Sequence, residues 1–106
     1  MLLLTIDYVP GKEIEALGLV KGTTVRAKHL GKDFMSSMKG LVGGEIVAYT
    51  EMLNEARAIA MKRMADEAEA LGADAVIGMM YGSAAVKQSA AEVIAYGTAV
   101  RFVDKK

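Results

Sequence analysis

The feature that most constrains this chain is a helix pattern in its middle. Gly43 and Gly44 precede it, and residues 45–71 repeat apolar side chains at helical spacing. One stripe carries Ile46, Leu53, Ala60, Met64 and Leu71, and the opposite side carries Glu51, Glu55, Lys62, Asp66 and Glu69. Gly72 follows, and glycine is the usual residue just beyond a helix C-terminus. The sequence therefore predicts a long amphipathic helix that lies on a sheet.

Four segments around this helix have the features of strands. They are residues 2–6, 17–30, 73–83 and 92–103, with residues 84–90 expected to connect the last two. The last segment alternates larger residues with small ones. One face has Glu92, Ile94, Tyr96, Thr98, Val100 and Phe102, and the other has Val93, Ala95, Gly97, Ala99 and Arg101. We expect the small-residue face to let the helix approach closely.

The second strand candidate, residues 17–30, also alternates. We expect Val25, Ala27 and His29 to face inward, since Thr24, Arg26 and Lys28 occupy the positions between them. Residues 12–16, after Pro10, predict a brief helical or turn segment, and residues 31–40 predict a short helix. The predicted fold class is thus α+β, with one long helix packed on a small and mainly antiparallel sheet.

Length and composition indicate a single domain over residues 1–106. The chain is 53% hydrophobic, which is a surplus of apolar surface for so small a body. Its 13 basic and 13 acidic residues balance, so there is no net field to attract nucleic acid. Without cysteine the chain can form neither a disulfide nor a thiolate site. Packing in the core and at interfaces must therefore provide the stability.

The N-terminal sequence MLLLTIDYVPGKE predicts a strand and a turn, because it has no basic start and its apolar run stops at Thr5 and Asp7. No apolar stretch approaches the roughly 20 residues that a membrane span requires. We therefore expect a soluble, cytoplasmic protein with no membrane partner.

Several sequence blocks together resemble the YbjQ-like family, whose descriptive name refers to heavy-metal binding. They are GLVKGTTV, GKD, VGGEIVAYTEMLNEARAIAMKRM, LGADAVIGMMYG and AEVIAYGTAV, and they span nearly the whole chain. The resemblance implies a fold of the dodecin-subunit-like type and a homopentameric ring. The first strand departs from the family pattern, because LLLTIDY replaces the threonines usual there.

The residue types argue against the soft-metal site that the family name suggests. His29 is the single histidine, whereas zinc usually takes several Cys or His ligands. The methionines fall mostly at core spacing, where methionine commonly fills gaps. A satisfied core histidine is the simpler interpretation of His29, and metal binding stays open only if a ring brings several copies together. The cofactor, if there is one, is unknown.

Three polar residues of the predicted helix lie near its apolar stripe: Tyr49, Arg57 and Glu67. A charge there needs a partner, and Arg57 and Glu67 are too far apart along one helix to meet. We expect Arg57 to be buried against a carboxylate, with Glu92 as the leading candidate. Tyr96 and Thr98 share the face of Glu92 and complete the candidate set. A structural ion pair and a ligand pocket at a subunit boundary both remain open.

Two classes of function fit these residues. The first is a non-enzymatic ring that binds a small ligand or an ion in its lumen or between subunits. The second is an enzyme of unknown reaction that uses a Glu/Tyr/Arg site at a subunit interface, and a structural scaffold is a third possibility. We favour the first, because the chain has no cysteine for a Cys-His set, and Glu51 and Glu55 are expected on the solvated face of the helix instead of converging in a cleft.

Overall fold

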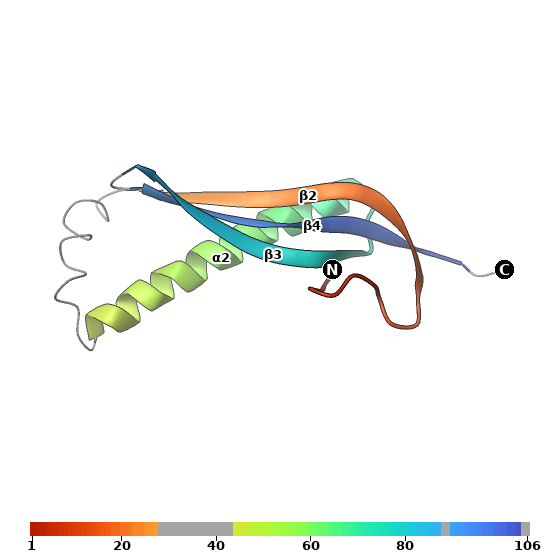
Figure 1. Cartoon of the computed structure of the whole chain (residues 1–106), viewed down its shortest axis with the longest axis horizontal. Coiled ribbons are helices and arrows are strands. Elements are labelled where there is room, and N and C mark those ends of the chain that lie inside the picture. The colour runs from red at the N-terminus through yellow and green to blue at the C-terminus, as the bar shows by residue number, and fades with distance from the viewer. Residues whose placement is uncertain (28–43, 88–89, 105–106) are drawn as a thin grey trace.

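In the computed structural model, which describes residues 1–27, 44–87 and 90–104, one helix packs on one face of a sheet. The elements are β1 (Leu2–Leu3), β2 (Glu13–Ala27), α2 (Gly44–Ala70), β3 (Ala75–Lys87) and β4 (Ala90–Val103). Figure 1 shows the two layers, with α2 running behind the strands. The predicted α+β class is confirmed.

The four strands form a mixed sheet in the order β1-β3-β4-β2. β4 pairs antiparallel with both β2 and β3, and the two-residue β1 pairs parallel with β3. β2 is therefore an outer strand along its whole length. The N-terminal segment lies along the other border, because the amides of Gly78 and Met79 donate to the carbonyls of Ile6 and Leu4.

The helix confirms the prediction for residues 45–71 to within one residue at each end. It ends where Gly72 adopts a φ of 81°, which is unfavourable for residues with a Cβ atom. The amide of Gly72 donates to the carbonyl of Glu69, and the amide of Ala73 donates to that of Ala68. Carbonyls of the last turn are thus satisfied within the chain.

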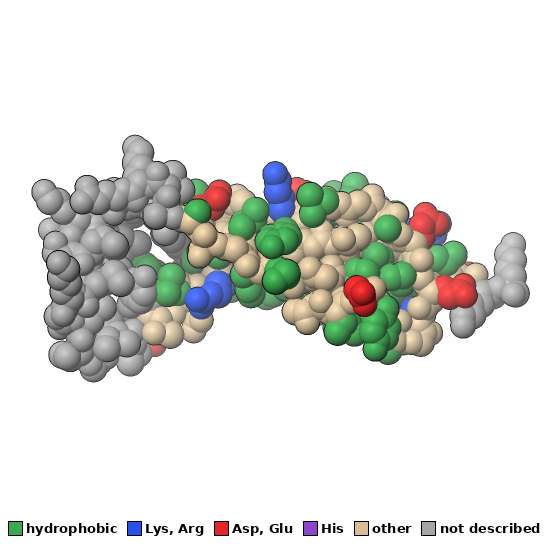
Figure 2. All heavy atoms as spheres, viewed as in Figure 1, with side chains coloured by type: hydrophobic (Ala, Val, Ile, Leu, Met, Phe, Trp, Pro, Cys, Tyr) green, Lys and Arg blue, Asp and Glu red, His purple; other side chains and the backbone are tan. Residues whose placement is uncertain are grey.

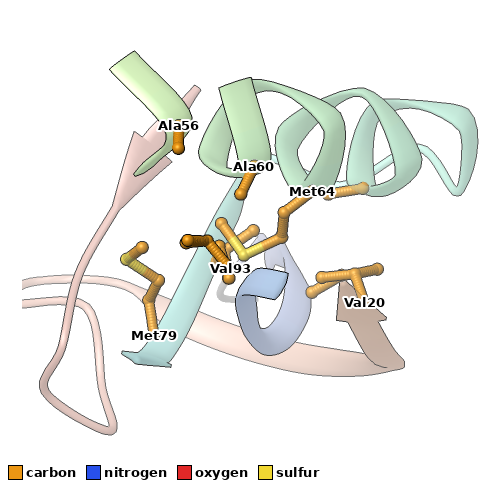
Figure 3. Close-up of a cluster of buried hydrophobic side chains, with 10 residues drawn as sticks. Val20, Ala56, Ala60, Met64, Met79 and Val93 are labelled. Carbon is orange, nitrogen blue, oxygen red and sulfur yellow. The ribbon is translucent and has the colours of Figure 1, made fainter. Parts of the chain in front are cut away.

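The main core lies between α2 and the sheet, and the side chains from the helix are mostly alanines. The helix contributes Ala56, Ala60, Met64 and Ala68, and the strands contribute Val20, Val76, Met79, Val93, Ala95 and Ala99. Figure 3 shows Met64 reaching from the helix toward the strands. The small-residue face of β4 lies in this core, as expected. The predicted helix stripe was partly wrong, since Leu71 is exposed and Leu53 is only half-buried. The reason is that alanines spaced four residues apart bring the helix closest to the sheet.

Two predictions for the second strand were wrong. Residues 13–16 are extended, because they pair with Val100–Val103 of β4 across an antiparallel ladder. The expected faces are also reversed, with Thr24 buried and Val25 exposed. A register shift between Ala16 and Gly18 changes which residues face the helix.

Other boundaries also differ from the sequence predictions. The first strand covers only Leu2–Leu3, whereas β3 and β4 extend through most of the expected connection at residues 84–90. The added length lets the two strands continue pairing as far as Lys87 and Ala90. The expected short helix at residues 31–40 and the candidate ligand His29 lie outside the described residues.

Candidate functional site

The sheet face turned away from α2 is rich in exposed apolar side chains, and we call it the open sheet face. Its residues are Leu19, Lys21, Thr23 and Val25 of β2, Met80 of β3, and Glu92, Ile94, Tyr96 and Thr98 of β4. Leu19 is 71% exposed, Met80 57% and Val25 55%. Figure 2 shows hydrophobic side chains along the strands, viewed as in Figure 1. This face is the candidate binding surface of the described chain.

Three of the sequence-predicted site residues lie on the open sheet face, spread along β4. Glu92, Tyr96 and Thr98 project from β4 on one side of the sheet, and residues two apart in a strand are separated by roughly 7 Å. Glu92 is half-buried between the strand positions of Val25 and Ala84. Within the described part of the chain, its carboxylate forms no hydrogen bond or ion pair.

The helix residues of the predicted set do not join this group. Arg57 is exposed, and its Nη1 donates to Asn54 Oδ1 at 2.9 Å. Its expected burial against a carboxylate is not seen within one chain, because the buried stripe is narrow and Arg57 lies on its flank. The sheet also separates Arg57 from Glu92, which projects from the opposite face. The side chain of Tyr49 lies outside the described residues.

Glu67 finds its partner on the sheet backbone. Its Oε1 accepts a hydrogen bond of 3.1 Å from the amide of Lys21, on the outer edge of β2. One turn away, Arg63 Nη1 donates to the carbonyl of Thr23 at 2.7 Å. The role of Arg63 was missed by the sequence reasoning, although its spacing of four residues from Glu67 places both on one helix face.

Gly22 is the residue that lets the helix come so close to this edge. A Cβ atom built on Gly22 would lie 2.2 Å from the carbonyl oxygen of Ala60 and 2.3 Å from the amide nitrogen of Met64. Both are backbone atoms, so no side-chain rotation could relieve the contact. Hence α2 and β2 pack backbone against backbone where Arg63 and Glu67 reach the strand.

The described side chains do not assemble a carboxylate or histidine metal centre. Among residues 1–27, 44–87 and 90–104, no three His, Cys, Asp or Glu side chains lie close enough to hold an ion together. Met64 and Met79 are buried in the main core, and the sulfur of Met61 accepts a hydrogen bond from the Tyr81 hydroxyl at 3.5 Å. No helix in the described residues is long and apolar enough to cross a bilayer.

Comparison with known proteins places this arrangement in a family. The sequence model of the YbjQ family, described as "Putative heavy-metal-binding", matches residues 1–103. The chain belongs to the YbjQ family. A UPF0145 protein of Fervidobacterium nodosum is 62% identical over 96% of this chain and 95% of its own length. One of Clostridium novyi is 57% identical over 97% of this chain and 100% of its own length.

A solved structure shares the fold of this YbjQ chain. It is a protein of unknown function from Pediococcus pentosaceus, assigned to the DUF74 family, with a TM-score of 0.69. The match covers 97% of this chain and 98% of that one at 17% identity, so it bears on the fold alone. Family membership therefore establishes the fold class of the YbjQ chain and leaves its biochemical activity uncharacterised.

Proposed function

We propose that this YbjQ protein works as a closed homopentameric ring that holds a small ligand or an ion in its lumen or between its subunits. The observation that carries the proposal is the open sheet face, where Leu19, Val25 and Met80 are each more than half exposed. Monomers rarely expose large contiguous apolar patches, and such surfaces mark interaction sites. A second copy of the chain is the occupant we assign to it.

The dimensions of the chain favour the same proposal. Its accessible surface is 6983 Å², whereas a folded monomer of 11.3 kDa is expected to expose about 5,700 Å². Its radius of gyration is 17.2 Å, against about 13 Å for a compact domain of this length. The excess surface is what subunit interfaces would bury. The number five comes from the family resemblance.

The mass of the assembly tests the ring. Light scattering on the purified protein should give about five times the 11.3 kDa chain mass. Leu19→Lys should reduce that mass, because it places a charge on the open sheet face. Leu71→Lys is the matched control, since Leu71 is also an exposed leucine but lies just beyond α2. A monomeric wild-type protein at micromolar concentration would refute the proposal, as would equal effects of the two substitutions.

Arg57 and Glu92 support a polar contact between subunits. Within the described part of the chain, Arg57 donates a hydrogen bond to the neutral side chain of Asn54 and forms no ion pair, and Glu92 has no partner. A ring that brings Arg57 of one copy to Glu92 of the next would pair both charges, with Tyr96 farther along the same face of β4. Such a contact would build the expected polar site from two copies.

Charge reversal tests this contact. Arg57→Glu and Glu92→Arg should each lower the assembled mass, and the double variant should restore it if the two side chains meet. Full assembly by both single variants would argue against the contact.

Native mass spectrometry of the intact assembly, together with elemental analysis, should detect a small molecule or ion bound in substoichiometric or whole-number amounts per ring. A ring free of both would refute the ligand part of the proposal.

A further inference from the structure

The outer edge of β2 has hydrogen-bonding groups that another strand could use. Among the described strands, β2 pairs with β4 on one side and with none on the other. Alternate residues of an antiparallel strand direct their backbone groups to opposite sides. The Lys21 amide donates to Glu67, and the Thr23 carbonyl accepts from Arg63. The backbone groups of the odd-numbered β2 residues Lys21 and Thr23 therefore point to the outer side of the strand. An exposed edge of this kind is a template for pairing with another chain.

The helix occupies this edge at its centre. The Lys21 amide is bound by the Glu67 carboxylate at 3.1 Å, and the Thr23 carbonyl is bound by the Arg63 guanidinium at 2.7 Å. Charged groups satisfy both backbone positions, and such hydrogen bonds are stronger than neutral ones. The Lys21 amide, before Gly22, and the Thr23 carbonyl, after it, therefore already have hydrogen-bond partners within the chain.

These two groups are the ones that a symmetric pairing of β2 with another β2 would need. If two antiparallel copies met with Gly22 opposite Gly22, Lys21 of each would lie opposite Thr23 of the other. Two residues opposed in this way form two hydrogen bonds, each from the amide of one residue to the carbonyl of the other. The amide of Lys21 would have to donate to the carbonyl of Thr23 in the second copy, and both groups are engaged.

We propose that Arg63 and Glu67 act as an edge clamp, which closes the outer edge of β2 against strand pairing with a second copy of this chain. The clamp determines which surface is available for assembly: it leaves the open sheet face free and blocks the two-fold β2 contact. An isologous β2 contact would produce dimers, whereas a closed ring requires a different interface on each side of the subunit. This inference is independent of whether the ring forms.

The test removes the clamp and detects the blocked pairing directly. Arg63→Ala with Glu67→Ala removes both contacts and keeps good helix formers. Lys62→Ala with Asp66→Ala is the matched control, because it deletes an exposed ion pair of 3.1 Å with the same spacing on the same helix. Both sets are made in a chain that carries Leu19→Cys and Val25→Cys, since the native sequence has no cysteine.

The cysteine pair reports on β2 pairing through the comparison of the three chains, because any cross-link across the open sheet face would form equally in all of them. The two positions are about 20 Å apart in one strand, too far for a disulfide within a copy. In the symmetric pairing, position 19 of one copy lies opposite position 25 of the other. We expect disulfide-linked dimers to increase at least tenfold in the clamp-deficient chain relative to the intact and control chains. Equal cross-linking in all three would overturn the proposal.

A second measurement keeps the proposal testable if the clamp-deficient chain does not fold. Amide exchange of the Glu67→Ala chain should accelerate at Lys21 at least tenfold, with the amides of Leu19 and Val25 unchanged. No acceleration at Lys21 would overturn the proposal. The assembled mass of the wild-type protein is measured separately, so a monomeric wild type would refute the ring while these comparisons still decide the clamp.

Discussion

Gly22 offers the sharpest test of how α2 and β2 are held together. In Gly22→Ala the new methyl group would lie 2.2 Å from the Ala60 carbonyl oxygen and 2.3 Å from the Met64 amide nitrogen. Ordinary contacts begin at about 3.4 Å, so the helix and the strand must separate by roughly 1 Å. Such a movement loosens the packing of Met64, which is fully buried. It also lengthens the hydrogen bonds of the edge clamp.

The expected cost follows from these contacts. Adding a methyl group to a well-packed core costs about 1 to 3 kcal/mol, and contact with backbone places Gly22→Ala at the upper end of that range. Replacing glycine stabilises by about 0.4 to 1 kcal/mol where the new side chain fits, which offsets a part of the loss. The net expectation is a loss of about 2 kcal/mol. In a domain of this size, that corresponds to a decrease in Tm of about 8 to 16 °C.

Gly82→Ala is the control. Its Cβ would lie 3.1 Å from Cγ2 of Ile94, a side-chain atom that can move, so we expect a change below about 0.5 kcal/mol. Urea unfolding at one fixed protein concentration, followed by circular dichroism, measures both variants. The fixed concentration matters because association shifts the apparent stability. Equal unfolding midpoints for the two variants would show that the close approach at Gly22 does not limit stability.

Three further substitutions test separate features of the fold by the same unfolding assay. Met64→Ala should lower the free energy of unfolding by about 2 to 5 kcal/mol, because the Met64 side chain is fully buried between α2 and the sheet. A loss below about 1 kcal/mol would contradict that packing. Thr24→Val should stabilise the protein by about 1 kcal/mol, since the buried Thr24 hydroxyl has no hydrogen-bond partner among the described residues. Destabilisation would mean that the hydroxyl is satisfied. Gly78→Ala should lower the free energy of unfolding by about 1 to 2 kcal/mol, because Gly78 has a φ of 61° that residues with a Cβ atom rarely adopt. No neighbouring atom of the described residues lies within 4 Å of the new methyl group, so a clash would not contribute. An unchanged unfolding midpoint would refute this backbone strain.

The elements whose residue pattern repeats regularly were predictable from the sequence. The helix pattern located α2 to within one residue at each end, and the alternation of β4 identified the small face that packs on the helix. The β2 strand was harder, because the register shift at Gly18 interrupts its period and reverses the faces beyond it. A sequence shows that Gly18 permits such a shift. It does not show where the shift occurs.

The candidate site was only partly predictable for a related reason. Glu92, Tyr96 and Thr98 do share one face, since that follows from the two-residue period of β4. Arg57 was expected in the core because a helical wheel assumes a broad buried stripe. The real stripe is a row of alanines and Met64 spaced by four residues, and Arg57 lies beside it. How wide a helix face is buried depends on the shape of the sheet beneath it, which the helix sequence does not specify.

The close approach at Gly22 links the core to the edge of the sheet. Because Gly22 has no side chain, α2 lies directly on the backbone of β2, and the side chains one turn apart in the helix can reach around the strand. Arg63 and Glu67 then bind the residues on either side of Gly22, Thr23 and Lys21. A larger residue at position 22 would therefore weaken the packing and open the edge together. Stability and protection of this edge therefore depend on the same contact.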